Sequence, residues 1–238
     1  MRILLTTDDG IVAPGLEALR RAARAFGEIF VFAPLHAHSG CSHRLTTGKT
    51  IHVAKRGPRE YAVDGTPGDC VRLGLHHAAC DWVLAGVNEG GNLGVDVFYS
   101  GTVAAAREAA IHGAPAAAFS HYVKRGRPRD WGQAEQWTSL VFSRIKDLEH
   151  APGTFWSVNF PHLAPGDEAP RIVCCPLDVN PLPLVYDREE GGYREAGAYD
   201  ERPRTRGADV EVCFSGNIAV TRLSTRHGSW DEGALAAL

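Results

Sequence analysis

Two adjacent acidic residues, Asp8 and Asp9, follow a short apolar run and stand directly before Gly10. The run from Ile3 to Thr6 is continuous, which is typical of a strand buried on both faces of a parallel sheet. Neighbouring carboxylates repel each other, and a turn needs at most one of them. In open α/β sheets, ligands bind at the carboxyl ends of the strands. The pattern therefore predicts a divalent cation at the end of this strand, the alternative being an Asp-Gly turn with one solvated charge.

Further oxygen donors follow two other expected strands. Ser39 lies in a loop rich in hydroxyl and imidazole groups after the strand 29–33, and Asn88 follows the apolar run 81–87. Because parallel strands present their carboxyl ends at one edge of the sheet, we expect both residues to meet the paired aspartates there. Two carboxylates, one hydroxyl and one amide carbonyl suit one Mg²⁺ or Mn²⁺ per chain, with Ca²⁺ as another ion that could bind, and they suit zinc poorly.

A glycine-rich loop and a helix start lie close to these donors in the sequence and could hold phosphate. Free N–H groups and the helix dipole favour an anion at a helix N-terminus, although a plain helix cap is the alternative. The loop does not match G-x-G-x-x-G, so no dinucleotide site is predicted. A metal beside a phosphate subsite indicates phosphoryl chemistry. The candidate residues are Gly90, Gly91 and Asn92 in the loop and Ser100, Gly101 and Thr102 at the helix start.

The order of the expected elements, strand, helix and strand, predicts an α/β fold with a mostly parallel sheet. Hydrophobic periodicity predicts strands over 3–6, 29–33, 81–87, 115–120, 154–160 and 217–222, helices over 14–26, 67–79, 100–110 and 134–148, and a β-hairpin over 48–64. The pattern weakens from about residue 171, and 176–207 is interpreted as an excursion of hairpins and loops. We expect one domain, 1–238, with an α/β core over 1–165 and a C-terminal excursion and tail over 166–238.

Composition narrows the classes of partner and compartment. The chain of 238 residues is 44% hydrophobic and 22% charged, with a net charge of -3, which gives no reason to expect a nucleic-acid polymer or an anionic membrane as partner. No apolar run is long enough for a signal peptide or a membrane span. The 6 cysteines form no C-x-x-C pair, which favours reduced thiols. We therefore expect a cytoplasmic protein, and the phosphate subsite described above predicts a small phosphorylated substrate.

Five segments, in this order and at similar spacing, resemble motifs of the survival protein SurE family. They are Thr7-Asp8-Asp9-Gly10, Ser39-Gly40, Gly65-Thr66-Pro67-Gly68-Asp69-Cys70-Val71, Gly86-Val87-Asn88-Glu89-Gly90-Gly91-Asn92-Leu93-Gly94 and Tyr99-Ser100-Gly101-Thr102-Val103-Ala104. The resemblance is close over about residues 1–120 and weaker over 157–161. It implies a Rossmann-like, doubly wound core, here residues 1–165, in a metal-dependent phosphatase of nucleoside 5′- and 3′-monophosphates that forms homodimers or homotetramers. It also implies metal ligation by Asp8, Asp9, Ser39 and Asn88 and a phosphate neighbourhood at Asn92, Ser100, Gly101 and Thr102.

Three departures from the family pattern fall mostly in the second half of the chain. Thr7 stands where the family usually has Asn, and the Thr-Arg pair usual near residue 171 is absent. Gly216-Asn217-Ile218-Ala219 replaces a Gly-Tyr-Val-Ser motif. We therefore expect the catalytic edge to be retained while the parts that cover the substrate and form the oligomer differ.

The expected mechanism is an in-line attack by water on a phosphate oriented by the cation. Either Asp8 or Asp9 would accept the proton from water, and a covalent aspartyl-phosphate on Asp8 is an alternative. His43 is a candidate acid for the leaving alkoxide, the alternative being an ordinary loop histidine. Two rival functions stay open, namely a short-chain polyphosphate hydrolase and a non-catalytic nucleotide-binding regulatory protein on the same fold.

Overall fold

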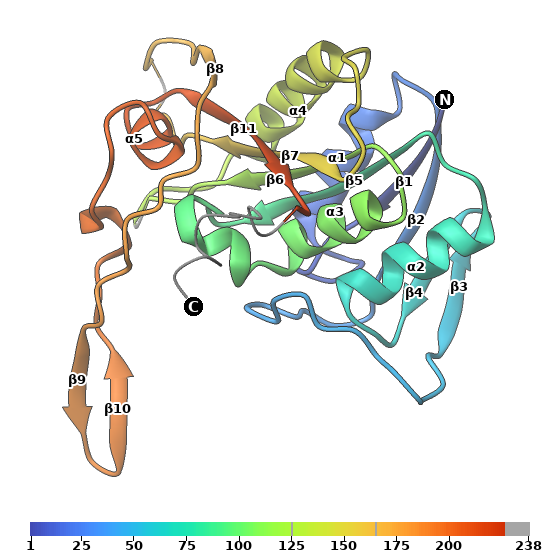
Figure 1. Ribbon diagram of the computed structural model, residues 1–238, viewed down its shortest axis with the longest axis horizontal. Helices are drawn as coiled ribbons and strands as arrows, with labels where there is room; N and C mark the ends of the chain where they lie inside the picture. Colours follow the sequence, from blue (N-terminus) through green and yellow to red (C-terminus); the bar gives the residue numbers. More distant parts are fainter. Residues whose placement is uncertain (125, 165, 227–238) are drawn as a thin grey trace, which may run out of the picture.

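A mixed sheet of nine strands forms the centre of the molecule (Figure 1), and the computed structural model describes residues 1–124, 126–164 and 166–226. The strands from β4 through β2, β1, β5 and β6 to β7 run parallel, whereas β3 and β11 are antiparallel to their neighbours β4 and β7. The α/β prediction with a mostly parallel sheet is therefore confirmed. In spatial order the strands are β3 (Val53–Gly57), β4 (Glu60–Val63), β2 (Glu28–Pro34), β1 (Arg2–Thr6), β5 (Trp82–Glu89), β6 (Ala116–His121), β7 (Thr154–Phe160), β11 (Ile218–Ser224) and β8 (Ile172–Cys174).

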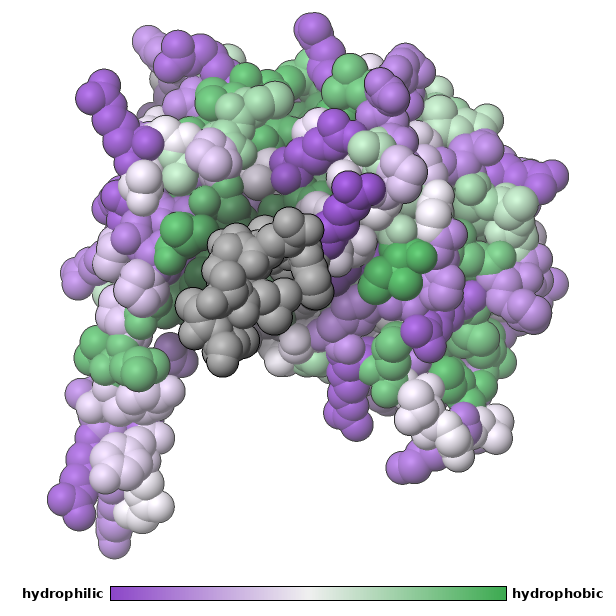
Figure 2. All heavy atoms as spheres, viewed as in Figure 1, coloured by the Kyte–Doolittle hydropathy of each residue, from purple (hydrophilic) through white to green (hydrophobic). Residues whose placement is uncertain are grey.

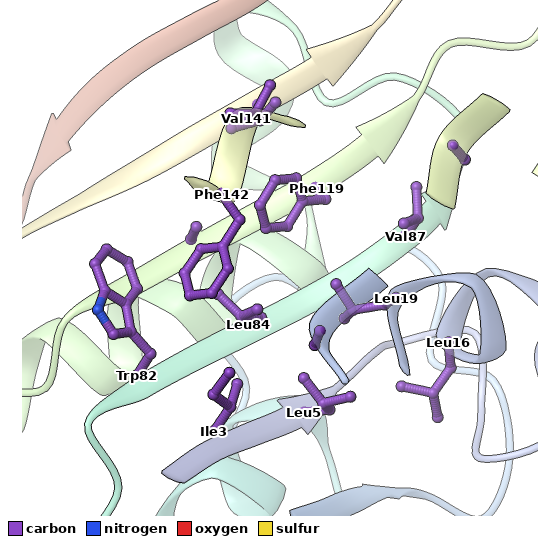
Figure 3. Close-up of a cluster of buried hydrophobic side chains, with 14 of the residues drawn as sticks. Ile3, Leu5, Leu16, Leu19, Trp82, Leu84, Val87, Phe119, Val141 and Phe142 are labelled. Carbon is purple, nitrogen blue, oxygen red and sulfur yellow. The ribbon is translucent and has the colours of Figure 1, made fainter. Parts of the chain in front are cut away.

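Helices cover both faces of the sheet, because alternate residues of the central strands are apolar on both sides. Ile3 and Leu5 of β1 pack into a core with α1 (Pro14–Ala23) and α4 (Trp131–Ile145), and Figure 3 shows part of that core. Leu4 points the other way, into a second core with α2 (Pro67–His77) and α3 (Gly101–Ile111). The central strand is therefore buried on both faces, as its continuous apolar run predicts.

Local sequence signals set the helix starts. In α2, Thr66 Oγ1 accepts the N–H of Asp69 at 3.3 Å and Asp69 Oδ2 accepts the N–H of Thr66 at 2.9 Å, and the two hydrogen bonds together form a capping box. Helix α1 ends at Ala23, earlier than expected, but the ring of Phe26 still packs edge-on against Phe142 with centroids 5.0 Å apart. The apolar stripe therefore extends beyond the last helical turn.

The order in which the strands are added to the sheet reverses at β1. Strands β2 and β4 lie on one side of β1, and strands β5, β6 and β7 lie on its other side. Such a switch point leaves a crevice at the carboxyl ends of the strands. The register of β5 shifts between Ala85 and Asn88, next to this crevice. Gly86 has a φ of +124°, and a Cβ there would lie 2.2 Å from the carbonyl oxygen of Phe119, so the irregular stretch requires glycine.

The C-terminal part returns to the sheet and also projects from it. The expected returning strand is β11, and an antiparallel hairpin of β9 (Tyr186–Glu189) and β10 (Gly192–Glu195) extends away from the body (Figure 1). In Figure 2 the far end of this hairpin is mostly hydrophilic, and apolar residues gather near its base, where Leu184 and Val185 are exposed. Residues 227–238 of the expected tail lie outside the described residues.

Two short elements were not expected from the sequence, namely β8 and α5 (Asp209–Phe214). Three and six residues are too few to show a helix or strand period. They belong to a third, small core in which Val210 and Cys213 pack with Leu93 and Tyr122. This core joins the C-terminal excursion to the loop that follows β5. No helix in the described ranges is both long and apolar enough to cross a bilayer.

Candidate active site at the end of β1

Asp8 lies directly beyond β1 and its side chain is only 4% exposed. Thr102 Oγ1, in the first turn of α3, donates a hydrogen bond to Asp8 Oδ1. Burial raises the pKa of Asp8, while the hydrogen bond from Thr102 and the backbone N–H groups at the start of α3 oppose that rise. The N-terminus of α3 therefore faces the Asp8 carboxylate.

Asp9 is half-buried and turns to the other side of the crevice, where its Oδ2 accepts the N–H of Glu89 at 3.1 Å. Burial, followed by the negative charge of Asp8, raises the pKa of Asp9 to about 6, against the opposing hydrogen bond from Glu89. The ion pairs of the described residues involve other carboxylates. Two carboxylates thus lie together without a compensating side-chain cation.

The structure brings the loop of Ser39 to Asp8. The N–H of His38 donates to the backbone carbonyl of Asp8 at 2.7 Å, and Ser39 follows on the exposed side of that contact. A Cβ added to Gly101 would lie 2.8 Å from Cys41 Sγ and 2.9 Å from Asp8 Cβ. The loop, the carboxylate and the start of α3 therefore meet with no room for a larger residue between them.

Asn88 lies at the end of β5, next to the residue whose N–H contacts Asp9. Its Nδ2 donates to the carbonyl of Gly90 at 2.8 Å, so the opposite end of the amide is the carbonyl oxygen that a cation would need. Asn88 is the first residue after the register shift described above, and it pairs there with Ser120 of β6. Metal ligation by Ser39 and Asn88 stays a prediction.

The expected phosphate-binding residues form hydrogen bonds with each other's segments and with neighbouring strands around the crevice in the described structure. Asn92 is buried, donates from Nδ2 to Ser120 Oγ at 2.7 Å, and exchanges two hydrogen bonds with the side chain of Asn159 through its own backbone. Ser100 Oγ caps α3 by accepting the N–H of Val103 at 3.0 Å. A plain helix cap was the alternative to phosphate binding, and the described hydrogen bonds include this cap. Phosphate binding at this helix start therefore stays a prediction.

The two glycines in the expected phosphate loop are also held by backbone contacts. Gly90 donates its N–H to the carbonyl of His121 at 3.0 Å. The carbonyl of Gly91 accepts a hydrogen bond from the hydroxyl of Tyr199 at 3.3 Å. The loop is therefore fixed from β6 on one side and from the C-terminal excursion on the other.

His43 contacts a carboxylate of α3 in the described structure. Its Nε2 lies 2.7 Å from Oε2 of Glu108. Glu108 is six residues after Thr102 on α3, which is roughly 9 Å along the helix axis at 1.5 Å per residue. The role of His43 as the acid for the leaving group stays a prediction, and the contact with Glu108 is its described side-chain partner.

Several residues of the site were missed by the sequence reasoning. Glu89 adds a third carboxylate beside Asp9 and pairs with Arg129. On the opposite side, Asp96 accepts hydrogen bonds from Tyr199 at 2.7 Å and from Arg202 at 2.6 Å. The position of Glu89 next to Asn88 was a signal in the sequence. No local pattern links Asp96 to residues more than one hundred positions away.

The donor set fits a hard divalent cation better than a transition-metal cage. Among the described residues, no group of three or more His, Cys, Asp or Glu side chains is arranged to hold a metal ion. A cation at Asp8 and Asp9 would therefore depend on neutral oxygens for its remaining protein ligands, as hard cations allow. A buried and a half-buried carboxylate, both with raised pKa values and with no paired cation among the described residues, form a site that a divalent ion would neutralise.

Comparison with known proteins gives concordant results. The family model described as Survival protein SurE matches residues 3–178. A protein of Synechocystis sp. is 48% identical over 94% of this chain and 99% of its own length. The protein named 5′-nucleotidase SurE from Geotalea daltonii is 43% identical over 94% of this chain and 92% of its own length. The crystal structure of the SurE protein from Aquifex aeolicus aligns with a TM-score of 0.85 at 29% identity, covering 97% of this chain and 96% of that one.

Proposed function

This chain belongs to the survival protein SurE family, and we propose that it hydrolyses nucleoside monophosphates in the crevice beyond β1 and β5. It is a 5′-nucleotidase, a phosphoric monoester hydrolase, like the relatives that carry this name. One observation carries the location of the chemistry. The paired carboxylates Asp8 and Asp9 lie at the switch point of the sheet, buried and half-buried, and neither has a cationic partner within the described part of the chain.

We propose that Asp8, Asp9, Ser39 and Asn88 hold the divalent cation, either Mg²⁺ or Mn²⁺, with Ca²⁺ able to bind. The support is the oxygen-only donor set and the uncompensated negative charge between β1 and β5. When bound, such an ion acts as a Lewis acid toward a phosphoryl oxygen and lowers the pKa of bound water. Ca²⁺ is the largest of the three ions and takes more ligands in a flexible geometry. Its binding would therefore depend least on the exact positions of the donor atoms.

The side chains divide the remaining work between them. Asp8 is committed to Thr102 and to the start of α3, so its role is to hold charge in a fixed place. Asp9 accepts one backbone N–H and is partly open to solvent, which makes it our proposed acceptor for the proton of the attacking water. The substrate phosphate would lie against the Gly90–Asn92 loop and the residues Ser100, Gly101 and Thr102.

A metal-by-substrate panel tests this function. Free phosphate is measured from AMP, GMP, 3′-AMP and tripolyphosphate with Mn²⁺, with Mg²⁺ and with EDTA. We expect metal-dependent release from the nucleotides. Faster release from tripolyphosphate than from AMP would favour the polyphosphate hydrolase, and no metal-dependent release from any substrate would favour the nucleotide-binding protein. The relative rates on AMP and 3′-AMP decide the preference between the 5′ and 3′ positions.

Two variants test the ligand assignment in the same assay. Asp8→Asn and Asp9→Asn are each expected to lower turnover about a hundredfold or more, since one electrostatic donor in such sites contributes that much. Asp147→Asn is the matched control, because Asp147 is an exposed carboxylate in the turn after α4. Full turnover by Asp8→Asn at saturating Mn²⁺ would refute the assignment.

Further proposals concern assembly, domain organisation and compartment. We propose a homodimer or homotetramer, supported by the projecting hairpin and by Leu184, which is 87% exposed at its base. Light scattering after size-exclusion chromatography measures the mass of the oligomer.

We also propose a single domain over 1–238, with a core over 1–165 and an excursion over 166–238. The six cysteines are all free thiols, which supports our proposal of a cytoplasmic location.

A further inference from the structure

Glu108 is a buried carboxylate with three basic partners from different parts of the chain. Its side chain is 1% exposed and lies on α3, facing α2 and the loop that carries Ser39. Oε2 contacts His43 Nε2 at 2.7 Å, and Oε1 contacts His112 Nε2 at 2.9 Å and Nε of Arg72. One carboxylate therefore ties together the loop, α2 and the end of α3.

The Glu108 carboxylate is strongly stabilised in its charged form. Burial alone would raise the pKa of Glu108, but the hydrogen bonds from His43, Arg72 and His112 lower it to about 2. Charge-assisted hydrogen bonds of this kind are roughly twice as strong as neutral ones. The contact to His43 is therefore a strong attachment point for an otherwise irregular loop.

The loop from His38 to Thr46 is attached on both sides of Ser39. On one side the N–H of His38 donates to the carbonyl of Asp8 at 2.7 Å. On the other side Ser42 donates from its N–H and its hydroxyl to the carbonyls of Tyr99 and Phe98 at 2.9 and 2.6 Å. His43 follows at once with its contact to Glu108. Ser39, Gly40 and Cys41 thus form a short bridge between two fixed ends.

The same helix also fixes the nearby carboxylate. Thr102 in the first turn of α3 donates to Asp8, and Glu108 two turns later contacts His43. A helix is rigid over this length, about 9 Å from Thr102 to Glu108. The spacing between Asp8 and the far end of the Ser39 loop is therefore set by one rigid element.

We propose that Glu108 is a positioning residue that acts through His43 to hold the Ser39 loop against Asp8, so that the loop is ready to complete the cation site. The inference rests on the proposed function, because it assigns Ser39 to the cation. Glu108 itself touches neither the cation nor the substrate. Its loss should weaken cation binding through displacement of the loop and leave turnover at saturating cation nearly unchanged.

The test compares variants that remove different partners of one carboxylate. Glu108→Gln keeps the shape of the side chain, and His43→Leu removes the loop contact. Arg72→Gln removes a partner that lies outside the loop and serves as the matched control. We measure Mn²⁺ binding from the electron paramagnetic resonance signal of free Mn²⁺. In EDTA we measure hydrogen exchange of the amides of residues 38–42 and thermal unfolding.

We expect Glu108→Gln and His43→Leu each to weaken Mn²⁺ binding about tenfold, with no further loss in the double variant. Exchange at residues 38–42 should rise in both, and His43→Gln should restore part of the loss because its amide can still donate. Arg72→Gln should lower the unfolding temperature but change the Mn²⁺ affinity less than twofold. Equal weakening by Arg72→Gln, or unchanged exchange in His43→Leu, would overturn the proposal. If the wild-type protein binds no Mn²⁺, the proposed function fails, and the exchange measurement in EDTA still decides whether Glu108 holds the loop.

Discussion

Replacement of His121 by phenylalanine should stabilise the protein and remove part of its sensitivity to acid. His121 ends β6 with its side chain 1% exposed, and neither ring nitrogen has a hydrogen-bond partner among the described residues. Its ring lies edge-on to those of Trp131, Trp137 and Phe160. An apolar ring of similar size suits these neighbours, whereas an unpartnered buried polar group costs about 1–3 kcal/mol.

The sign of the pH effect follows from the lowered pKa of His121. Burial, followed by the charge of His162, lowers the pKa of His121 to about 4 from its ordinary value of 6.5. Between these two pH values the unfolded chain takes up a proton that the folded protein does not. Above pH 6.5 the protonation of His121 therefore costs the folded protein nothing. As the pH falls from 6.5 toward 4, the free energy of unfolding decreases. The loss amounts to about 2 kcal/mol by pH 5, at about 1.4 kcal/mol per pH unit.

Urea unfolding at pH 7.0, 6.0 and 5.0, followed by tryptophan fluorescence, measures the effect. Other groups also titrate in this range, so the quantity of interest is the difference between the wild-type protein and His121→Phe. That difference should grow by about 2 kcal/mol from pH 7 to pH 5. His52→Gln, an exposed histidine, should leave the pH dependence of the wild type unchanged. A His121→Phe protein whose stability falls as steeply as that of the wild type would refute the reasoning.

Three further predictions concern the site and its supports. Gly101→Ala would place a Cβ 2.9 Å from Asp8 Cβ and should lower turnover at least tenfold and the free energy of unfolding by about 1–3 kcal/mol. The control Gly192→Ala, whose added Cβ would have no neighbouring described atom within 4 Å, should change neither quantity. Phosphate release measures turnover, and urea unfolding measures stability. Arg202→Gln breaks the buried ion pair with Asp96 and should lower the free energy of unfolding in urea by about 3 kcal/mol. A decrease below about 1 kcal/mol would contradict the stabilising role of this ion pair. Removal of divalent ions with EDTA should abolish phosphate release from AMP, and Mn²⁺ should restore it.

The central sheet could be predicted from the sequence because its signals are local. The apolar run of β1, the capping box of α2 and the glycine at position 86 each specify their own segment. The rule that parallel strands end at one edge then brings Asp8 and Asp9 near Asn88 without any structure.

The remaining features depend on contacts between distant residues. The sequence did not indicate that the hydroxyl of Thr102 donates to Asp8 or that the ring of His43 contacts Glu108. In both cases the residue type suggested a polar partner but could not say which one. The short elements β8 and α5 were missed because they become regular only by packing against β11 and the third core.

The projecting hairpin has a practical consequence for engineering. Tyr199, Arg202 and Asp209 tie the excursion to the loop after β5, and all three lie closer to the C-terminus than the hairpin tip. Gly191 at the tip has open space around it, and its φ of +81° marks a tight reversal of the chain. A peptide tag or fluorescent label inserted there would leave every contact of the crevice intact while reporting on whatever the hairpin touches.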